Sequence, residues 1–437
     1  MWIARLTATF PHTHSPAIRQ IYFIWISTSK PIAQTQTSIG MDWRALVGDN
    51  SMMDFDVVIV GGGLAGLSLA AALRRSTLSV ALIEGQPPVF PETLDSRIYA
   101  ISPANAAFLG ELGAWGHLDA TRMEAVRTME IHGDAGGRLD FTAYDCGVSE
   151  LAWILESSLM QRELWETVKR QGNLALFCPA RPQALSIGPD AALLNLQDGR
   201  SLSARLIVAA DGAESWTRTA AGVAVRFDPY DQQGVIANFA AELPHRGTAF
   251  QWFRTDGVLA WLPLPGNRIS MVWSAPEDYG RKLLALGHAE LCALVAEAGD
   301  HRLGKLELIT PPAGFPLRLM RAPNAVAPRL ALIGDAAHTI HPLSGHGINL
   351  GFQDARVLAA VLCDKPGHVD CGDLGLLRAY ERARKEEVVT LQTLTDSLHD
   401  LFRPATGSLK RLRNFGLNLT NALPVVKNLL VRYALAS

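Results

Sequence analysis

The chain has 437 residues, with 40 Lys and Arg against 42 Asp and Glu, and its formal net charge is −2. This near balance offers no basic field to the backbone of a nucleic acid, so nucleic-acid binding is disfavoured. Hydrophobic residues make up 48% and charged residues 19%, which is typical of a folded protein and excludes a disordered composition. At about 150 residues per domain, the length predicts two or three domains.

The cysteine and histidine patterns argue against disulfides and metal sites. The five cysteines are scattered without a CxxC pair, at Cys146, Cys178, Cys292, Cys363 and Cys371. An odd count without close pairing fits a reducing compartment rather than a disulfide framework or a zinc site. His338 and His341 have no acidic pattern around them, so no metal site is predicted. No run of about 18 apolar residues is present, and no transmembrane helix is expected.

Residues 1–53 are predicted to be a disordered extension outside the fold. Up to residue 40 this stretch contains Arg5, Arg19 and Lys30, lacks acidic residues and is rich in Ser, Thr and Gln. That composition fits an organellar transit peptide, which would place the protein in mitochondria. The preferred alternative is a non-native upstream extension, with the natural start at Met52 or Met53, because a strand is predicted directly afterwards.

A strand, a glycine-rich turn, a helix and a second strand open the folded part. The β-branched run Asp56–Val60 predicts a buried parallel strand, and it leads straight into Gly61-Gly62-Gly63-Leu64-Ala65-Gly66. Helix is expected over 67–75 and strand over 79–84. A glycine-rich turn in this context is typical of a dinucleotide-binding site.

Each glycine of this turn has a separate physical task. Gly61 makes the tight turn, Gly63 lets the backbone approach a pyrophosphate, and Gly66 lets the helix pack on the strand. Glu84 ends the second strand, where a carboxylate binds the ribose hydroxyls. The motif alone could be an ordinary turn, and it does not separate NAD from FAD; the flanking strands and Glu84 indicate a dinucleotide.

Two further strand-like runs end in a carboxylate. They are Leu206–Asp211, followed by Gly212, and Leu330–Asp335. A carboxylate at the C-terminal end of a parallel strand lies where open α/β sheets bind ligands. After Asp335 a glycine-rich loop precedes a helix expected from about Ile348, whose positive end favours the negative charge of a reduced flavin. Each motif alone is an ordinary strand–turn–helix, but together with the first turn they indicate FAD.

The combined motifs resemble those of the single-component flavin hydroxylases, which are FAD-dependent aromatic monooxygenases. The resemblance rests on GGGLAG at 61–66, the D-G-x-x-S-x-x-R run from Asp211 to Arg218, and GDAAHTIHPLSGHGINLGFQDA at 334–355. Within this group the chain is most similar to the ubiquinone-biosynthesis hydroxylases that act on polyprenyl phenols. Looser stretches at 95–102, 155–161 and 248–265 carry that part of the resemblance, which covers residues 54–437.

The resemblance implies a set of FAD-contacting residues. The first turn would hold the ADP part of FAD through Gly61, Gly63, Ala65 and Gly66, with Glu84 on the adenosine ribose. Further along the cofactor, the implied contacts are Arg97 and Gln161 near the phosphate and ribityl region, Asp211 and Gly212 at the cleft where FAD and nicotinamide meet, Asp335 on the ribityl chain, Pro342, Gly345 and Gly347 beside the isoalloxazine, and Asn349 at the start of the helix aimed at it.

No catalytic acid or base is identified from the sequence. Pro342 and His346, both in the loop beside the isoalloxazine, are the candidates for a catalytic role. Many family members have Gln where this chain has His346. A histidine at this position introduces a group that titrates near neutral pH next to the implied flavin site.

The predicted fold class is α/β (α+β), with a Rossmann-like FAD-binding domain, an inserted, mostly antiparallel substrate sheet, and C-terminal helices. The FAD-binding domain is expected over 54–228 and 318–403, the substrate domain over 229–317, and a helical tail over 404–437. The segment 124–150 is expected to add strands to the substrate sheet.

Four aromatic residues of the expected substrate sheet have two interpretations. Trp252, Phe253, Trp261 and Trp273 lie in strand-like runs punctuated by Pro and Gly. They either line an apolar pocket or form ordinary core, and the core interpretation is preferred because buried aromatic side chains are common in sheets.

The resemblance implies an FAD-dependent monooxygenase. NAD(P)H, bound transiently without a second Rossmann unit, would reduce FAD, and O2 would supply the oxygen that hydroxylates a lipid-like aromatic substrate. One alternative is another FAD enzyme of the same fold, such as a prenyl reductase or a halogenase, although the Trp-x-Trp-x-Ile-Pro run of a halogenase is absent. The other is a non-catalytic FAD-holding scaffold in a quinone-biosynthesis complex.

The C-terminal tail is both basic and apolar. From Ser408 to Ser437 it has five basic residues and no acidic ones, interleaved with leucines, and Pro424 is expected to divide it into two short helices. Such a segment suits peripheral contact of a cytoplasmic protein with the inner face of an anionic membrane, into which a polyprenyl phenol partitions. The alternative is that its apolar residues pack on the FAD-binding domain.

Overall fold

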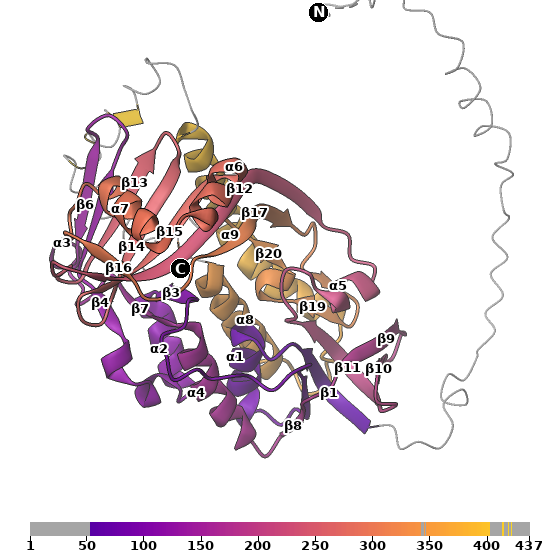
Figure 1. Ribbon diagram of the computed structural model, residues 1–437. Helices are drawn as coiled ribbons and strands as arrows, with labels where there is room; N and C mark the ends of the chain where they lie inside the picture. The colour runs from indigo at the N-terminus through magenta and orange to yellow at the C-terminus, as the bar shows by residue number, and fades with distance from the viewer. Residues whose placement is uncertain are drawn as a thin grey trace, which may run out of the picture. The chain divides into compact units, whose positions relative to one another are not determined.

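The computed structural model describes residues 53–341, 345 and 347–402, together with the tail residues 413, 414, 418 and 421. The extension predicted over 1–53 lies outside these residues except for Met53. Within the described chain, the strands form two large sheets and one small sheet, with helices packed against them (Figure 1). This confirms the mixed α/β class that the sequence predicts.

The first sheet has a parallel centre. Its strands are β1 (Met53–Val60), β2 (Val80–Ile83), β8 (Leu174–Phe177), β11 (Ser201–Ala209) and β19 (Leu330–Leu332), with β9 (Pro182–Ile187), β10 (Ala192–Leu196) and β18 (Val326–Ala327) added antiparallel. The parallel order is β19-β11-β1-β2-β8. Because β1 lies between β2 and β11, the strand order reverses there, and ligands of open α/β sheets bind at the C-terminal end of such a strand.

The second sheet is mostly antiparallel and contains the strands that the sequence predicts for the substrate domain, so we call it the substrate-side sheet. Its strands are β5 (Thr128–His132), β6 (Arg138–Thr142), β12 (Arg226–Ala241), β13 (Thr248–Arg254), β14 (Gly257–Leu264), β15 (Arg268–Pro276), β16 (Leu306–Leu308), β17 (Ala313–Arg321) and β20 (His338–Thr339). The order is β20-β17-β12-β15-β14-β13-β5-β6, with β16 beside β12, and β5 runs parallel to β13. A small third sheet joins β3 (Ile98–Ile101), β7 (Ala152–Glu156) and β4 (Glu124–Val126).

The helices cover these sheets on separate faces. The α-helices are α1 (Leu64–Ala72), α2 (Pro103–Glu111), α3 (Ala143–Cys146), α4 (Ser157–Lys169), α5 (Trp216–Ala220), α6 (Glu277–Ala285), α7 (His288–Ala298), α8 (Gly347–Cys363) and α9 (Leu374–Phe402). Short 3-10 turns are η2 (Leu73–Arg75), η3 (Trp115–His117), η4 (Ala120–Arg122) and η5 (Gly334–Ala336). Side chains of α1, α4 and α8 share one core with the parallel sheet, while α6 and α7 lie over the second sheet (Figure 1).

The two faces of the second sheet differ in character. Strand alternation points Trp261 and Trp273 toward α6 and α7, where they are fully buried, and Trp252 shares this core and donates its Nε1–H to Asp300 Oδ2 at 3.1 Å. The core interpretation is therefore confirmed for these three residues. A cavity of about 520 Å³ beside Trp252 and Phe253 is lined by Arg138, Arg254 and Asp300, so it is charged rather than apolar.

Described residues of the tail contact the β5–β6 hairpin. Arg413 forms an ion pair with Asp134 in which both side chains are 3% exposed. Asn414 Oδ1 accepts hydrogen bonds from the backbone N–H groups of Ala135 and Gly137 at 3.1 and 2.9 Å. Asn418 and Asn421 accept from the next outward-facing N–H groups, those of Arg138 and Asp140, at 2.8 and 3.1 Å. Because β6 is an edge strand, these amides satisfy N–H groups that no strand reaches. These contacts lie on the β5–β6 hairpin, and Arg413 also donates to the carbonyl oxygen of Leu401 on α9 at 2.9 Å.

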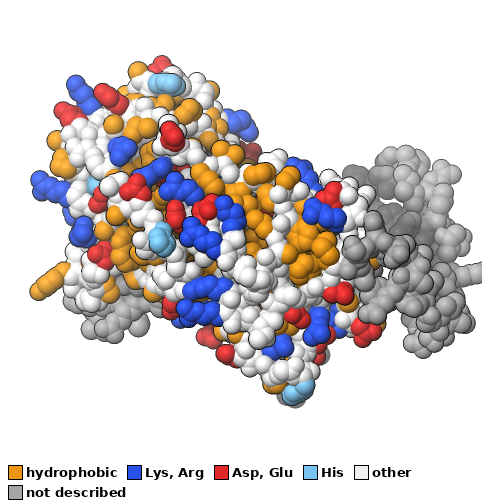
Figure 2. All heavy atoms as spheres, turned by 90° about the horizontal axis from the view of Figure 1, so that it is seen from below, with side chains coloured by type: hydrophobic (Ala, Val, Ile, Leu, Met, Phe, Trp, Pro, Cys, Tyr) orange, Lys and Arg blue, Asp and Glu red, His pale blue; other side chains and the backbone are white. Residues whose placement is uncertain are grey.

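The surface carries both signs of charge. Figure 2 shows basic and acidic side chains interspersed over the face that is seen from below. That face therefore has no field of a single sign, in agreement with the net charge of −2. In the part of the chain that the structure describes, no helix has the length and apolar character needed to cross a membrane.

Candidate cofactor site

The glycine-rich turn joins β1 to α1 at the C-terminal edge of the parallel sheet. Gly61 has φ +113°, and a Cβ added there would lie 2.4 Å from the carbonyl oxygen of Ala210. A Cβ added at Gly66 would lie 2.0 Å from the carbonyl oxygen of Gly61. Gly63 differs, because no described atom lies within 4 Å of its Cβ position. The fold therefore requires glycine at 61 and 66, whereas the space above Gly63 is open to a ligand.

Helix α1 begins at this open space without a cap. Gly63 is its N-cap residue, no described side chain caps the helix, and its first turn has no acidic residue. The first N–H groups of a helix have no partner within the helix and carry positive partial charge. A phosphate is the ligand that such groups favour. The turn and the helix start therefore fit the pyrophosphate of a dinucleotide.

Glu84 and Gln161 both hold the turn at Gly62. Glu84, directly after β2, accepts a hydrogen bond from the Gly62 N–H through Oε2 at 2.7 Å and one from the Gln86 N–H through Oε1 at 3.0 Å. Gln161 on α4 donates from Nε2 to the Gly62 carbonyl oxygen at 2.9 Å. The structure thus brings these two predicted residues together at Gly62, where they hold the backbone on both sides of its Cα. The motif did not reveal this role.

Asp211 and Gly212 stand at the C-terminal end of β11, next to β1. Asp211 accepts from the Ser215 hydroxyl through Oδ1 and from the Thr217 N–H through Oδ2 at 2.9 Å, which caps α5. Gly212 has φ +84°, a left-handed conformation that favours glycine. The carboxylate therefore orders the whole D-G-x-x-S-x-x-R run.

Arg218 ends this motif, but the sequence assigned it no role in the site. Its buried guanidinium donates to the carbonyl oxygens of Ala213 at 2.8 Å and Ala336 at 3.0 Å. Ala336 follows Asp335, so Arg218 ties the first carboxylate loop to the second. An arginine at a fixed distance after the Asp-Gly pair was the available signal.

Asp335 lies on η5, where β19 meets the site. Its carboxylate reaches the surface of the site but is crowded by protein atoms, and this desolvation raises the pKa of Asp335, while the charges of His338 and Arg97 oppose the rise. Arg97 is exposed and close enough to act on Asp335. A Cβ added at Gly334 would lie 3.2 Å from Ala65 Cβ, and one added at Gly351 would lie 3.5 Å from it. The first turn, the Asp335 loop and α8 therefore meet at one place.

Asn349, in the first turn of α8, ties that helix to β3 and α2. Its Oδ1 accepts from the Ser102 N–H and from Asn105 Nδ2, both at 3.0 Å. Its Nδ2 donates to the carbonyl oxygens of Ala100 at 2.8 Å and Gly345 at 3.3 Å. Asn349 therefore fixes the first turn of α8 against β3 and α2. The helix begins at Gly347, one residue before the predicted start; Gly345 has φ +64°, and Pro342 and His346 lie outside the described residues.

The substrate-side sheet contacts the segment that follows β20 through its strand β12. His341, fully buried just before the loop, has Nε2 3.0 Å from Gln232 Oε1, and its ring centroid lies 4.8 Å from that of Tyr230. Burial raises the pKa of the Tyr230 hydroxyl above its ordinary value. The cross-strand neighbours Ile236 and Val272 lie on the same sheet face as Gln232 and are only partly buried. Gln232, Ile236 and Val272 thus place polar and apolar side chains on one face of this sheet.

Comparison with known proteins agrees with this geometry. Residues 54–393 match the family model for the FAD binding domain. The ubiquinone hydroxylase UbiL of Rhodospirillum rubrum is 34% identical over 87% of this chain and 90% of its own length. The 3-demethoxyubiquinol 3-hydroxylase of Escherichia coli is 32% identical over 87% of this chain and 98% of its own. The p-nitrophenol 4-monooxygenase PnpA of Pseudomonas putida shares the fold, with a TM-score of 0.73 at 18% identity over 88% of this chain and 99% of that one. The chain therefore belongs to the family of FAD-dependent monooxygenases that carry this FAD-binding domain.

Proposed function

We propose that this protein hydroxylates the aromatic ring of a polyprenyl phenol in ubiquinone biosynthesis, with NAD(P)H as the reductant and O2 as the oxygen source. The observation that carries the proposal is the similarity to two ubiquinone-pathway hydroxylases over 87% of this chain and at least 90% of each relative. Bound FAD supplies the redox chemistry, and the protein supplies binding, orientation and exclusion of water.

The described residues divide these tasks between the two sheets. On the parallel sheet, the open N-terminus of α1 at Gly63 binds the pyrophosphate, and Glu84 and Asp335 bind the sugar parts of FAD. On the second sheet, the half-buried Ile236 and Val272 offer an apolar surface to the aromatic ring and its prenyl chain. This division is supported by His341, which follows Asp335 by six residues and has Nε2 3.0 Å from Gln232 Oε1 of β12.

Oxygen incorporation tests the proposal. The FAD-loaded protein is mixed with NAD(P)H and a short-chain polyprenyl phenol under ¹⁸O2. We expect the phenol to accelerate NAD(P)H oxidation and the product to carry one ¹⁸O atom on its ring. Gly63→Val, which alters the cofactor turn and leaves the second sheet intact, is the matched control. The proposal is contradicted, and the scaffold alternative supported, if the protein is yellow but the phenol does not change the rate of NAD(P)H oxidation and no labelled product forms.

We further infer that the tail mediates peripheral contact with the inner face of the cell membrane. Arg413 is committed to the ion pair with Asp134, which leaves Lys410, Arg411, Lys427 and Arg432 as the bases for anionic headgroups. Basic residues among apolar ones favour binding to an anionic surface. The cytoplasmic location, the mitochondrial alternative and membership of a quinone-biosynthesis complex stay predictions.

Charge neutralisation tests the membrane contact better than truncation, because truncation also removes the asparagines that cover β6. The four remaining tail bases are changed to Gln, and sedimentation with anionic vesicles is measured at low and high salt. The matched control changes four exposed bases elsewhere, Arg75, Arg170, Lys282 and Lys385, to Gln. Selective loss of sedimentation in the tail variant supports the contact, and equal sedimentation of the two variants contradicts it.

A further inference from the structure

A buried network of charges links the Asp335 segment to helices α8 and α9. Asp354 on α8 is 0% exposed and accepts hydrogen bonds from the Gly334 N–H at 2.9 Å, from His338 Nε2 at 2.7 Å and from Arg384 Nε at 2.8 Å. His338 and Arg384 are buried as well. One carboxylate therefore joins the segment that carries Asp335, strand β20 and helix α9. The stretch between β20 and α8, which the resemblance places beside the isoalloxazine, is called the flavin loop.

Asp354 favours the charged forms of His338 and Arg384, and each of them favours the charged form of Asp354. Burial alone would raise the pKa of Asp354, but the charges and hydrogen bonds of His338 and Arg384 hold it below its ordinary value. Burial alone would lower the pKa of His338, but Asp354 raises it. A buried carboxylate is tolerated when cations and hydrogen bonds compensate its charge, and removal of one partner leaves that compensation incomplete. The position of the loop is thereby coupled to Arg384.

Helix α9 holds the same segment at a second point. Gln392 donates from Nε2 to the carbonyl oxygens of Met320 at 3.0 Å and Thr339 at 3.2 Å. Gln392 follows Arg384 by about two helical turns, so both side chains project from one face of α9. Gln392 thus ties α9 to the paired strands β17 and β20.

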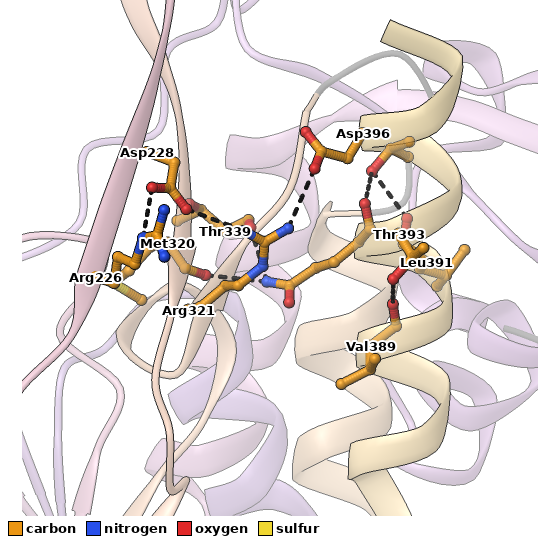
Figure 3. Close-up of polar contacts among 11 residues, drawn as sticks. Arg226, Asp228, Met320, Arg321, Thr339, Val389, Leu391, Thr393 and Asp396 are labelled. Carbon is orange, nitrogen blue, oxygen red and sulfur yellow. Dashed lines mark hydrogen bonds and ion pairs between the residues drawn. The ribbon is translucent and has the colours of Figure 1, made fainter. Parts of the chain in front are cut away.

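The far half of α9 is attached to the substrate-side sheet. Arg321 lies between Asp228 of β12 and Asp396 of α9, with N–O distances of 2.9 and 3.2 Å (Figure 3). Tyr380, nearer the start of α9, donates its hydroxyl to the Leu332 carbonyl oxygen of β19 at 2.8 Å. The helix is therefore anchored on both sheets, and the charge network lies between its two anchors.

We propose that His338, Asp354 and Arg384 are positioning residues for FAD, through which α9 holds Gly334, Asp335 and the start of the flavin loop in the geometry that binds the cofactor. They act through the Gly334 N–H and the backbone after His338. Since FAD binding is a property of the family, the proposal does not depend on which phenol is hydroxylated.

The test compares FAD affinity with stability in the FAD-free protein. The variants are Asp354→Asn, Arg384→Met and Arg384→Lys, and Arg382→Met is the matched control, because Arg382 is exposed on the same helix two residues away. Each protein is stripped of FAD, its thermal unfolding is recorded, and it is titrated with FAD by flavin fluorescence. The visible spectrum of the bound flavin is the third readout.

We expect Asp354→Asn and Arg384→Met to raise the Kd for FAD by about tenfold or more and to change the flavin spectrum. The magnitude is taken by analogy from residues that orient the ligands of a bound metal, whose loss weakens metal binding by a similar factor. Arg384→Lys, which keeps the charge but loses the guanidinium fork, should restore part of the affinity. Arg382→Met should bind FAD like the wild type.

A purely structural role of the network predicts a different pattern: a lower unfolding temperature, with an unchanged Kd and an unchanged flavin spectrum in the folded fraction. That pattern in Asp354→Asn or Arg384→Met overturns the proposal. If neither variant folds, Arg384→Lys and Gln392→Leu decide. Weaker FAD binding at an unchanged unfolding temperature then supports the proposal, and an unchanged Kd overturns it.

Discussion

A valine at Gly63 should abolish tight FAD binding while the FAD-free protein stays folded. The backbone at Gly63 has φ −75° and ψ −179°, which any L-residue adopts, and no described atom lies within 4 Å of the Cβ position. The cost to folding is therefore that of an unfavourable N-cap residue, about 1 kcal/mol.

The same space is the one that a pyrophosphate has to enter. The N–H groups in the first turn of α1 reach a phosphate only if no side chain stands between them. A hydrogen bond to a charged group contributes about 1.5–3 kcal/mol. Loss of two such bonds costs roughly 3 kcal/mol or more, which corresponds to about a 100-fold or greater loss of FAD affinity.

Gly66→Ala is the contrasting control. Its Cβ would lie 2.0 Å from the Gly61 carbonyl oxygen and 3.1 Å from Ala210 Cβ, so the backbone of the turn has to move. We expect a loss of about 3 kcal/mol in the free energy of unfolding of the FAD-free protein.

Thermal unfolding of the FAD-free proteins and fluorescence titration with FAD separate the two effects. Gly63→Val should unfold near the wild-type temperature and bind FAD poorly, whereas Gly66→Ala should already be destabilised without FAD. Wild-type FAD affinity in Gly63→Val would refute the placement of the pyrophosphate. Equal destabilisation of the two variants would refute the packing argument.

Further predictions concern His338, the tail and the loop. The pKa of His338 is raised by Asp354, so its contribution to stability is complete below about pH 6.5 and is lost as pH rises through the raised value. Urea unfolding of the FAD-free protein between about pH 5.5 and 9 should show a steeper decline for the wild type than for His338→Gln, and parallel declines would contradict this. Arg413→Met removes the cation that compensates the buried Asp134 carboxylate and should lower the free energy of unfolding by about 3 kcal/mol, with partial recovery when Asp134→Asn is added; no recovery would argue against the ion pair as the cause. Protonated His346 should favour the anionic reduced flavin, so the midpoint potential of the wild type should vary more with pH, from about 5.5 to 8, than that of His346→Gln, and identical pH dependences would exclude this role.

Local patterns in the sequence determine the elements of the cofactor site. The run Asp56–Val60, the turn at 61–66 and the strand before Glu84 appear where the sequence predicts them, because a β-branched run and a glycine turn are decided by neighbouring residues. The Asp-Gly and Gly-Asp motifs mark strand ends for the same local reason.

The tertiary structure alone decides which of these residues meet. Asp354 joins His338, 16 residues away, and Arg384, 30 residues away, while the Arg413–Asp134 pair spans 279 residues. The different roles of Gly63 and Gly66 likewise depend on what surrounds a Cβ, and motif spacing does not contain that information. Alternation and periodicity show which face of an element is buried, but strand order and helix crossings select the partner across it. A buried charge is stable only beside such a partner. The network of His338, Asp354 and Arg384 therefore becomes visible only once the chain is folded.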